Sequence, residues 1–340
     1  MSQITQRKQQ HIKAILTDSA IERNASGFDA IKLTHRALPE LNFDEIDSST
    51  EFLHKTLSFP LLISSMTGGA ADNLVQINKN LALAAEKEQV ALAVGSQRTM
   101  ISNQDAIKSF QLRQYAPTIP LIANMGAVQL NYDYGLDEAT KMVETLQADA
   151  LYLHLNPLQE LIQPEGNTNF SGLAEKIEQL AKQLSVPIIL KEVGCGLSEK
   201  DLQLGIKAGI NWFDVAGRGG TSWSRIEAHR TENITADSLG ILFQDWGLTT
   251  VESLKIARPY QGQANFIASG GLRNGIDMIK SVIMGGCICG MASPFLEPAI
   301  VSVTEVQYKI QQLRQQYRVA QFLLGVPSTA DLFLQETLIE

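Results

Sequence analysis

Eight short apolar runs, separated by polar segments, constrain the fold of this chain most strongly. They occupy residues 60–65, 90–95, 120–124, 150–154, 187–191, 212–217, 265–270 and 286–291. Strands of a parallel sheet are buried on both faces, so they read as nearly continuous apolar runs instead of alternating ones. The runs therefore predict eight parallel strands.

Amphipathic segments between these runs predict helices. Residues 136–146 and 173–184 each place their apolar side chains on one helical face, and Ser198 is expected to cap a further helix. Eight alternating strand–helix units predict an α/β fold of the (β/α)8 TIM barrel type. A doubly wound open sheet is the alternative, but eight regularly repeated units favour a closed barrel.

The chain is predicted to form a single domain over residues 1–340, with residues 1–59 as an N-terminal extension packing on the barrel. No linker or low-complexity tract interrupts the sequence. Within the extension we expect a helix over 7–16 and an irregular segment over 27–49. The connection after residue 217 is long, and long insertions in a compact domain are usually functional or form interfaces.

Composition narrows the possible partners. A net charge of −8 argues against a general nucleic-acid binder. No apolar stretch is long enough to span a bilayer, and the N-terminus has no apolar signal core, so a cytoplasmic protein without a membrane partner is expected. Cys195, Cys287 and Cys289 are too few for a disulfide framework and are predicted to be small buried fillers.

The seventh and eighth predicted strands end in segments suited to an anion. Their ends read Ser269-Gly270-Gly271-Leu272-Arg273 and Gly290-Met291-Ala292-Ser293. Barrels of this type often bind phosphate in the loops after these two strands. Glycine allows backbone N–H groups to approach an anion closely, and Arg273 adds positive charge. A phosphate site is therefore predicted here.

Lys191 ends an otherwise apolar run and must meet an anionic or electron-rich partner. The partner is a Schiff-base substrate, a carboxylate or the electron-rich edge of a flavin. Ser65, Ser96 and Asn124 end neighbouring strands and suit a planar heterocycle better than acid–base chemistry. Together with the phosphate site, these residues favour flavin mononucleotide (FMN) over a phosphorylated sugar.

The segment 154–160 follows an apolar run with a cluster of polar side chains. Tyr152, His154 and Asn156 alternate onto one strand face, and Gln159 and Glu160 come just after them. So many polar groups at a buried strand end indicate a ligand site, with a satisfied polar turn as the alternative. Glu160 is a candidate Mg²⁺ ligand, because Mg²⁺ prefers one or two carboxylates with substrate phosphate oxygens.

A second anion site is suggested by basic residues elsewhere. Arg98 comes just after the second strand end, and Arg7 and Lys8 begin the predicted terminal helix. A solvated helix face is the ordinary explanation for the pair in the helix, so Arg98 is the stronger candidate.

The string His-Leu-Asn-Pro-x-Gln-Glu at 154–160 is the most specific motif of the chain. The other motifs are Arg7-Lys8, Ser65-Met66-Thr67-Gly68-Gly69, Gly95-Ser96-Gln97-Arg98, Asn124-Met125-Gly126, Lys191-Glu192-Val193-Gly194, Ala216-Gly217-Arg218-Gly219-Gly220-Thr221 and Ser269-Gly270-Gly271-Leu272-Arg273. In these motifs, and over almost its whole length, the chain resembles the type 2 isopentenyl-diphosphate delta-isomerases, which are FMN-dependent barrels.

The resemblance implies interconversion of isopentenyl and dimethylallyl diphosphate by a 1,3-allylic proton shift. It implies reduced FMN as acid and base, Mg²⁺ on the diphosphate, NADPH or another reductant, and a homo-oligomer, tetrameric or octameric. The implied FMN contacts are Ser65, Met66, Thr67, Ser96, Asn124, Lys191, Thr221, Gly271, Arg273, Ala292 and Ser293. The implied substrate contacts are Arg7, Lys8, Ser96, Gln97, Arg98, His154, Asn156 and Gln159. Glu160 is the implied metal ligand, and Gln159, Lys191 and His154 are the implied catalytic residues.

The principal rival is another FMN-dependent barrel, such as a 2-hydroxy-acid oxidase. That chemistry needs a histidine base near the later strand ends, where this chain has Arg218 and Arg273 but no histidine. An inosine-monophosphate dehydrogenase would need a cysteine after the sixth strand, and none occurs there. A non-enzymatic flavin-storing barrel is disfavoured by polar residues at all eight strand ends.

Overall fold

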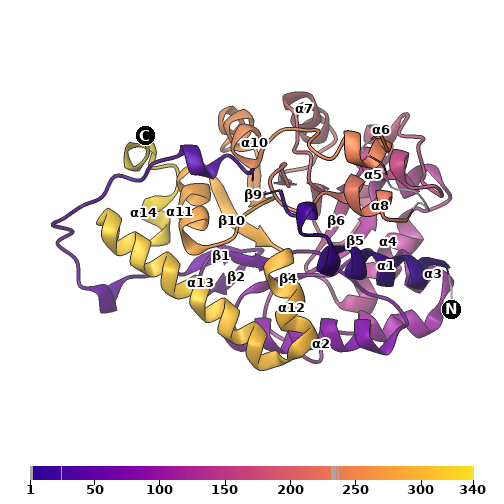
Figure 1. The fold of residues 1–340 in the computed structure, drawn as a ribbon, viewed down its shortest axis with the longest axis horizontal. Coiled ribbons are helices and arrows are strands. Elements are labelled where there is room, and N and C mark those ends of the chain that lie inside the picture. Colours follow the sequence, from indigo (N-terminus) through magenta and orange to yellow (C-terminus); the bar gives the residue numbers. More distant parts are fainter. Residues whose placement is uncertain (1–2, 24, 231–234, 236) are drawn as a thin grey trace.

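Eight parallel strands close into a barrel in the computed structural model, which describes every residue except 1–2, 24, 231–234 and 236, and the side chains from residue 8 onward except that of residue 9 (Figure 1). Neighbours follow the chain, and the last strand pairs with the first. All eight predicted strands are confirmed, and so is the (β/α)8 barrel. They are β3 (Leu61–Ile63), β4 (Ala91–Ala93), β5 (Leu121–Gly126), β6 (Ala150–Leu155), β7 (Ile188–Glu192), β8 (Trp212–Asp214), β9 (Asn265–Ser269) and β10 (Gly286–Met291).

Helices follow the strands and cover the outside of the barrel. The predicted helices at 136–146 and 173–184 are confirmed as α4 (Leu136–Leu146) and α6 (Leu173–Gln183). Ser198 caps α7 (Glu199–Lys207), as predicted, by accepting the backbone N–H of Asp201. The others are α2 (Asp72–Glu88), α3 (Arg98–Ser102), α5 (Pro157–Ile162), α8 (Trp223–Ala228), α9 (Leu239–Leu242), α10 (Thr250–Ala257), α11 (Gly275–Ile283), α12 (Ser293–Val301), α13 (Val303–Leu324) and α14 (Thr329–Leu332).

The bottom of the barrel is closed by a small hairpin from the extension. Its strands, β1 (Thr50–Phe52) and β2 (Lys55–Leu57), immediately precede β3. Phe52 and Leu57 are buried against the apolar side chains that fill the barrel interior, and Phe52 packs edge-on against Trp212 at the start of β8. This apolar plug leaves the carboxyl-terminal ends of the strands as the place for chemistry.

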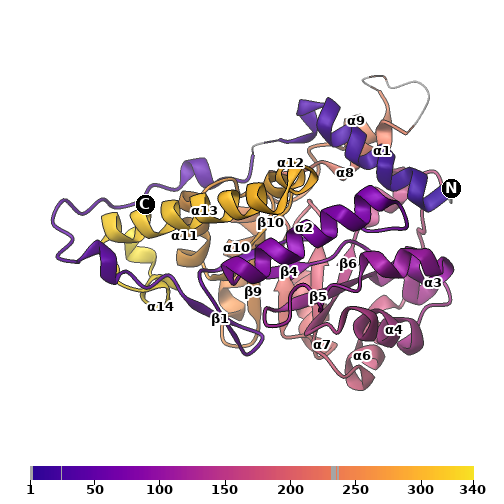
Figure 2. The ribbon, with the colours of Figure 1, turned by 90° about the horizontal axis from the view of Figure 1, so that it is seen from below.

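The rest of the extension runs along the side of the barrel to its other end. The predicted helix at 7–16 is present as α1 (Gln3–Thr17), which packs against α8 (Figure 2). Ala14 and Ile21 are buried against Ile226 of α8. The segment 27–49 is largely irregular, as predicted, and contains two short 3-10 turns.

The prediction that all three cysteines are buried fillers is right only for Cys289. Cys195, in the loop after β7, and Cys287, at the start of β10, are partly exposed. Partial burial still raises the pKa of the Cys195 thiol to about 12, so the thiol stays protonated at neutral pH. No helix in the described part of the chain is both long and apolar enough to cross a membrane.

Candidate active site

The carboxyl-terminal ends of all eight strands line a single large cavity. It is also lined by α1 and by the connection after β8. The predicted residues that line it are Lys8, Ser65, Met66, Thr67, Ser96, Arg98, Asn124, His154, Asn156, Gln159, Glu160, Lys191, Thr221, Gly271, Arg273, Ala292 and Ser293. The backbone of Arg7 lies in α1, but its side chain is outside the described part of the structure.

Gln97 is the predicted substrate residue whose side chain does not reach the cavity. It is completely buried, its Oε1 accepts the backbone N–H of Asn124 at 3.0 Å, and its Nε2 donates to the carbonyl of Met142 at 3.0 Å. The expected contact between this side chain and substrate is therefore corrected. Gln97 joins β5 to α4 and thereby fixes the position of Asn124.

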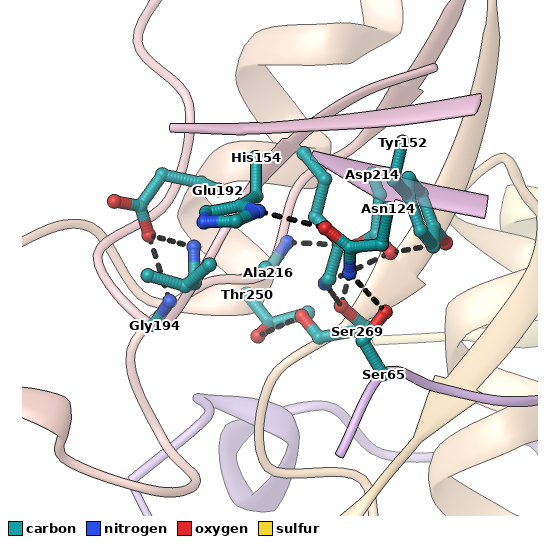
Figure 3. Close-up of polar contacts among 12 residues, drawn as sticks. Ser65, Asn124, Tyr152, His154, Glu192, Gly194, Asp214, Ala216, Thr250 and Ser269 are labelled. Atoms are coloured by element: carbon teal, nitrogen blue, oxygen red, sulfur yellow. Dashed lines mark hydrogen bonds and ion pairs between the residues drawn. The ribbon is translucent and has the colours of Figure 1, made fainter. Parts of the chain in front are cut away.

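Asn124 is the centre of a polar chain on the floor of the cavity (Figure 3). Its Nδ2 donates to the hydroxyl of Ser65 at 2.8 Å and to the carbonyl of Val94 at 3.0 Å. Its Oδ1 lies 2.7 Å from Nδ1 of His154. Because the amide oxygen can only accept, His154 carries its proton on Nδ1 in this contact.

Lys191 meets a carboxylate that sequence reasoning missed. Its Nζ lies 3.0 Å from Oδ2 of Asp214, which is completely buried, and 3.3 Å from the hydroxyl of Ser269. The same carboxylate accepts the hydroxyl of Tyr152 at 2.7 Å and that of Ser269 (Figure 3). Of the three partners considered for Lys191, the structure contains the carboxylate. The sequence signal that could have pointed to Asp214 is an acidic residue inside the apolar run 212–217.

The loops after β8 and β9 form a glycine cradle that fits a phosphate. Gly270 and Gly271 have φ of +101° and +81°, a left-handed conformation that favours glycine. A Cβ on Gly271 would lie 2.4 Å from the carbonyl oxygen of Gly219, and one on Gly220 would lie 2.8 Å from the nitrogen of Gly271. The two loops thus meet backbone to backbone.

Further donors surround this cradle. Thr221 and Arg273 also line the cavity, and α12 begins at Ser293 with its N-terminus at the cavity. Backbone N–H groups at a helix start and a guanidinium together match the needs of a phosphate.

A second polar region surrounds Glu160 on the opposite wall. Its Oε1 accepts Nδ2 of Asn156 at 2.9 Å, and its Oε2 accepts the backbone N–H of Asn167 at 2.5 Å. The side chain of Asn167 in turn accepts Arg98 at 3.2 Å and Gln129 at 3.1 Å. The loop that carries Asn167 therefore ties the carboxylate to the cation.

Two amide oxygens in this region are buried without a hydrogen-bond partner among the described residues. They are Oδ1 of Asn156 and Oε1 of Gln129, and both residues line the cavity. Such orphaned acceptors fit a cation or a hydrogen-bond donor that binds there. The described residues contain no group of three or more metal-binding side chains, so a metal here would take Glu160 together with substrate and water oxygens.

Lys8 brings a cation from α1 to the mouth of the cavity. Its Nζ donates to the carbonyls of Gly68 and Ser96, the latter at 3.0 Å, and lies 5.8 Å from the centroid of the Phe110 ring. The terminal helix thus reaches the loops after β3 and β4. Lys8 and Arg98 form a basic region that is separate from the glycine cradle.

Gln159 is held by a buried ion cluster from the long connection after β8. Its Nε2 donates to Oε1 of Glu227 at 2.9 Å, and the same oxygen lies 3.0 Å from Nε2 of His11. Arg230 contacts the other carboxylate oxygen at 2.8 Å. Burial by itself would raise the pKa of Glu227, but the contacts with His11, Gln159 and Arg230 lower it to about 2. The connection was expected to be functional, yet its sequence did not single out Glu227.

We expect Glu227→Gln to reduce the loss in the free energy of unfolding that accompanies acidification. The carboxyl has a pKa of about 2 when folded against an ordinary 4.5. It therefore stabilises the fold fully above its unfolded pKa and loses this contribution as the pH falls toward its folded pKa. Urea unfolding at neutral pH and near pH 3 should show a drop in wild type that exceeds the drop in the variant by about 2 kcal/mol. Equal drops would contradict the assignment.

Comparisons with known proteins agree with this geometry. A sequence model of the FMN-dependent dehydrogenase family matches residues 136–339. Among solved structures, a flavocytochrome b2 variant with sulfite bound superposes with a TM-score of 0.71 at 19% identity, over 97% of this chain and 82% of that chain. A mandelate oxidase variant gives a TM-score of 0.65 at 15% identity, over 95% and 91%. At these identities the two structures support the fold alone.

Curated relatives match nearly full length. An isopentenyl-diphosphate delta-isomerase of Hydrogenovibrio crunogenus is 68% identical over 99% of this chain and 98% of the relative. One of Paracoccus zeaxanthinifaciens is 55% identical over 98% and 96%, and one of Rickettsia akari is 46% identical over 96% and 95%. The resemblance inferred from the motifs is thus confirmed, and the chain belongs to the isopentenyl-diphosphate delta-isomerase family, on an FMN-dependent dehydrogenase barrel.

Proposed function

We propose that this protein interconverts isopentenyl diphosphate and dimethylallyl diphosphate, using reduced FMN and Mg²⁺. One observation carries the proposal beyond the family name. A single cavity is lined by two separate regions suited to an anion, the glycine cradle with Arg273 and the region of Lys8 and Arg98. One region suits the phosphate of the cofactor and the other suits the diphosphate of the substrate.

The residues around the cradle and floor fit FMN. Thr221, Gly271, Arg273, Ala292 and Ser293 would hold its phosphate. The remaining residues on the floor would hold the ring, and they are Ser65, Met66, Thr67, Ser96, Asn124 and Lys191. When bound and reduced, with NADPH as the proposed reductant, FMN would supply the acid–base chemistry that a weakly basic alkene requires. Lys191 would stabilise negative charge beside the reduced ring.

The opposite wall would hold the diphosphate. Lys8 and Arg98, with Arg7 as a further proposed contact, would neutralise its charge, and Glu160 would bind Mg²⁺. The orphaned oxygens of Asn156 and Gln129 support a cation here. Fixing the diphosphate end in this way positions the carbon end of the substrate against the floor.

Gln159 and His154 would stand beside the reacting carbons. Both the nitrogen and the oxygen of the Gln159 amide are hydrogen-bonded, because Nε2 donates to Glu227 and Oε1 accepts Nδ2 of Asn156 at 3.2 Å. An amide held in this way orients a neighbour better than it removes a proton. We therefore propose that Gln159 positions the substrate. We propose that His154, which can carry a proton, acts as a catalytic residue beside it.

We also propose that the protein is a cytoplasmic homo-oligomer, either a tetramer or an octamer. Four of the apolar side chains with exposed fractions above half lie on α5 and on the connection after β8, and they are Leu161, Leu239, Leu242 and Trp246. Exposed apolar groups of this kind support association with another surface.

The decisive experiment is anaerobic incubation of the purified protein with isopentenyl diphosphate, FMN, a reductant and Mg²⁺, followed by NMR. We expect a yellow protein and formation of dimethylallyl diphosphate that stops when the flavin is removed from the protein or the reductant is omitted. Separate anaerobic samples of the oxidised, FMN-loaded protein with lactate or mandelate and no other reductant test the oxidase alternative, and their flavin should stay oxidised. A protein that cannot be loaded with FMN, or one that is loaded but leaves isopentenyl diphosphate unchanged, would refute the proposal.

A further inference from the structure

Residues 21–23 of the N-terminal extension pair with the loop after β8 as a short antiparallel bridge. The N–H of Ser222 donates to the carbonyl of Ile21 at 2.8 Å, and the N–H of Arg23 donates to the carbonyl of Gly220 at 3.2 Å. Glu22 lies opposite Thr221 in this bridge. The extension thus adds a strand-like segment directly behind the predicted phosphate cradle.

The carboxylate of Glu22 joins the two loops of the cradle. One oxygen accepts the hydroxyl of Thr221 at 2.6 Å, and the other forms an ion pair with the guanidinium of Arg273. Thr221 and Arg273 both line the cavity, whereas Glu22 does not. Glu22 therefore contacts Thr221 and Arg273 from outside the cavity lining. It accepts the one proton of the Thr221 hydroxyl, whereas the guanidinium of Arg273 keeps further N–H groups for a ligand.

Arg23 holds the same loop from another direction. Its guanidinium donates to the carbonyls of Gly220 at 3.1 Å, Thr221 at 3.2 Å and Gly194 at 3.0 Å, and to that of Gln244 at 2.5 Å. A guanidinium that satisfies four carbonyls from three loops fixes those loops relative to one another.

Ser26 completes the contact by packing on two glycines of the cradle. A Cβ on Gly219 would lie 2.3 Å from the Cα of Ser26, and a Cβ on Gly271 would lie 2.9 Å from its Cβ. Both loops of the cradle are therefore shaped against the extension as well as against each other.

We propose that Glu22 and Arg23 are positioning residues for the cofactor phosphate. Glu22 holds the guanidinium of Arg273 in place, and Glu22 and Arg23 together fix the loop that carries Thr221. A long arginine side chain otherwise samples many rotamers, so a fixed partner favours phosphate binding. This inference rests on the proposed function, because it takes the phosphate at the cradle to be that of FMN.

Loss of the Glu22 carboxylate could affect FMN binding in two opposite directions, and a titration distinguishes them. A carboxylate beside Arg273 also cancels part of its positive charge, which would weaken attraction for a phosphate. Orientation predicts that losing the carboxylate weakens FMN binding, and charge cancellation predicts that it strengthens it. The placement of Glu22 outside the cavity lining favours orientation.

Fluorescence titration of flavin-free Glu22→Gln with FMN and with riboflavin, which lacks the phosphate, tests the inference. We expect FMN to bind about tenfold more weakly than to wild type. Riboflavin affinity should change less than about twofold, because only the phosphate contacts are altered. Thermal unfolding confirms that the variant is folded, and Glu22→Asp provides the same comparison if Glu22→Gln does not fold.

Asp18→Asn is the matched control. Asp18 lies in the same extension, and its carboxylate contacts Arg225 at 2.6 Å and His229 at 2.7 Å without touching the cradle. It should leave the ratio of FMN to riboflavin affinity unchanged. Unchanged or tighter FMN binding by Glu22→Gln overturns the inference, as does an equal loss of both flavins. Failure of the wild-type protein to bind FMN overturns the proposed function itself.

Discussion

Lys191→Met should destabilise the fold by about 3 kcal/mol, because it leaves a buried carboxylate without its cation. Asp214 is completely buried, and the ammonium of Lys191 lies 3.0 Å from it. Tyr152 and Ser269 still donate to the carboxylate in the variant, which keeps the loss at the lower end of the range for broken buried pairs. Urea unfolding measures the loss. Lys176→Met, which removes an ammonium bonded only to the backbone carbonyl of Leu130 and to no carboxylate in the described structure, should change stability by less than about 1 kcal/mol.

The double variant Lys191→Met/Asp214→Asn separates the structural role of Lys191 from its catalytic role. Removing both charges together should recover most of the lost stability, since neither partner is left as an isolated charge. Turnover should stay at least about 100-fold below wild type, because the positive charge beside the reduced ring is still absent. Wild-type turnover in the FMN-loaded double variant would show that the ion pair serves the fold alone.

Glu160→Gln should lower Mg²⁺-dependent turnover by about 100-fold while FMN affinity stays unchanged. The carboxylate is the sole acidic side chain lining the polar region around Asn156 and Asn167 in the described structure. Replacing it with an amide removes the anionic ligand that Mg²⁺ requires. Even mutation of a residue that only hydrogen-bonds a metal ligand typically lowers metal affinity or activity by about 10- to 100-fold.

Steady-state kinetics over a range of Mg²⁺ concentrations separates this loss from general damage. The variant should need more Mg²⁺ for half-maximal rate, and its flavin fluorescence titration should match that of wild type. Glu178→Gln is the control, because that carboxylate pairs with Lys182 on the outer surface of α6. An unchanged Mg²⁺ requirement in Glu160→Gln would remove Glu160 from the metal site.

The barrel could be predicted from the sequence because strands buried on both faces leave a local signature. Each apolar run marks a strand without reference to any other part of the chain. The strand ends then follow in order around the mouth, so residues such as Ser65, Asn124 and Arg273 could be placed together before their contacts were known. Chain order and barrel closure together convert eight local patterns into one site.

Side-chain contacts between different strands and loops could not be predicted in the same way. Asp214 interrupts an apolar run, but only the register of β7 against β8 shows that it faces Lys191. Gln97 and Ser96 are adjacent in sequence, yet the turn after β4 directs one toward α4 and the other toward the cavity. Glu22 contacts Thr221 across 199 residues, a pairing that no local pattern contains.

The hairpin plug and the bridge at residues 21–23 also bear on how the protein is made. The barrel closes when β10 pairs with β3, so its last strand must be available before the ring is complete. Residues 21–57 leave the ribosome earlier, yet their contacts lie at both ends of that ring. Phe52 and Leu57 therefore reach their complete packing only when the late strands have been made, and until then we expect the nascent extension to expose apolar surface of the kind that chaperones bind.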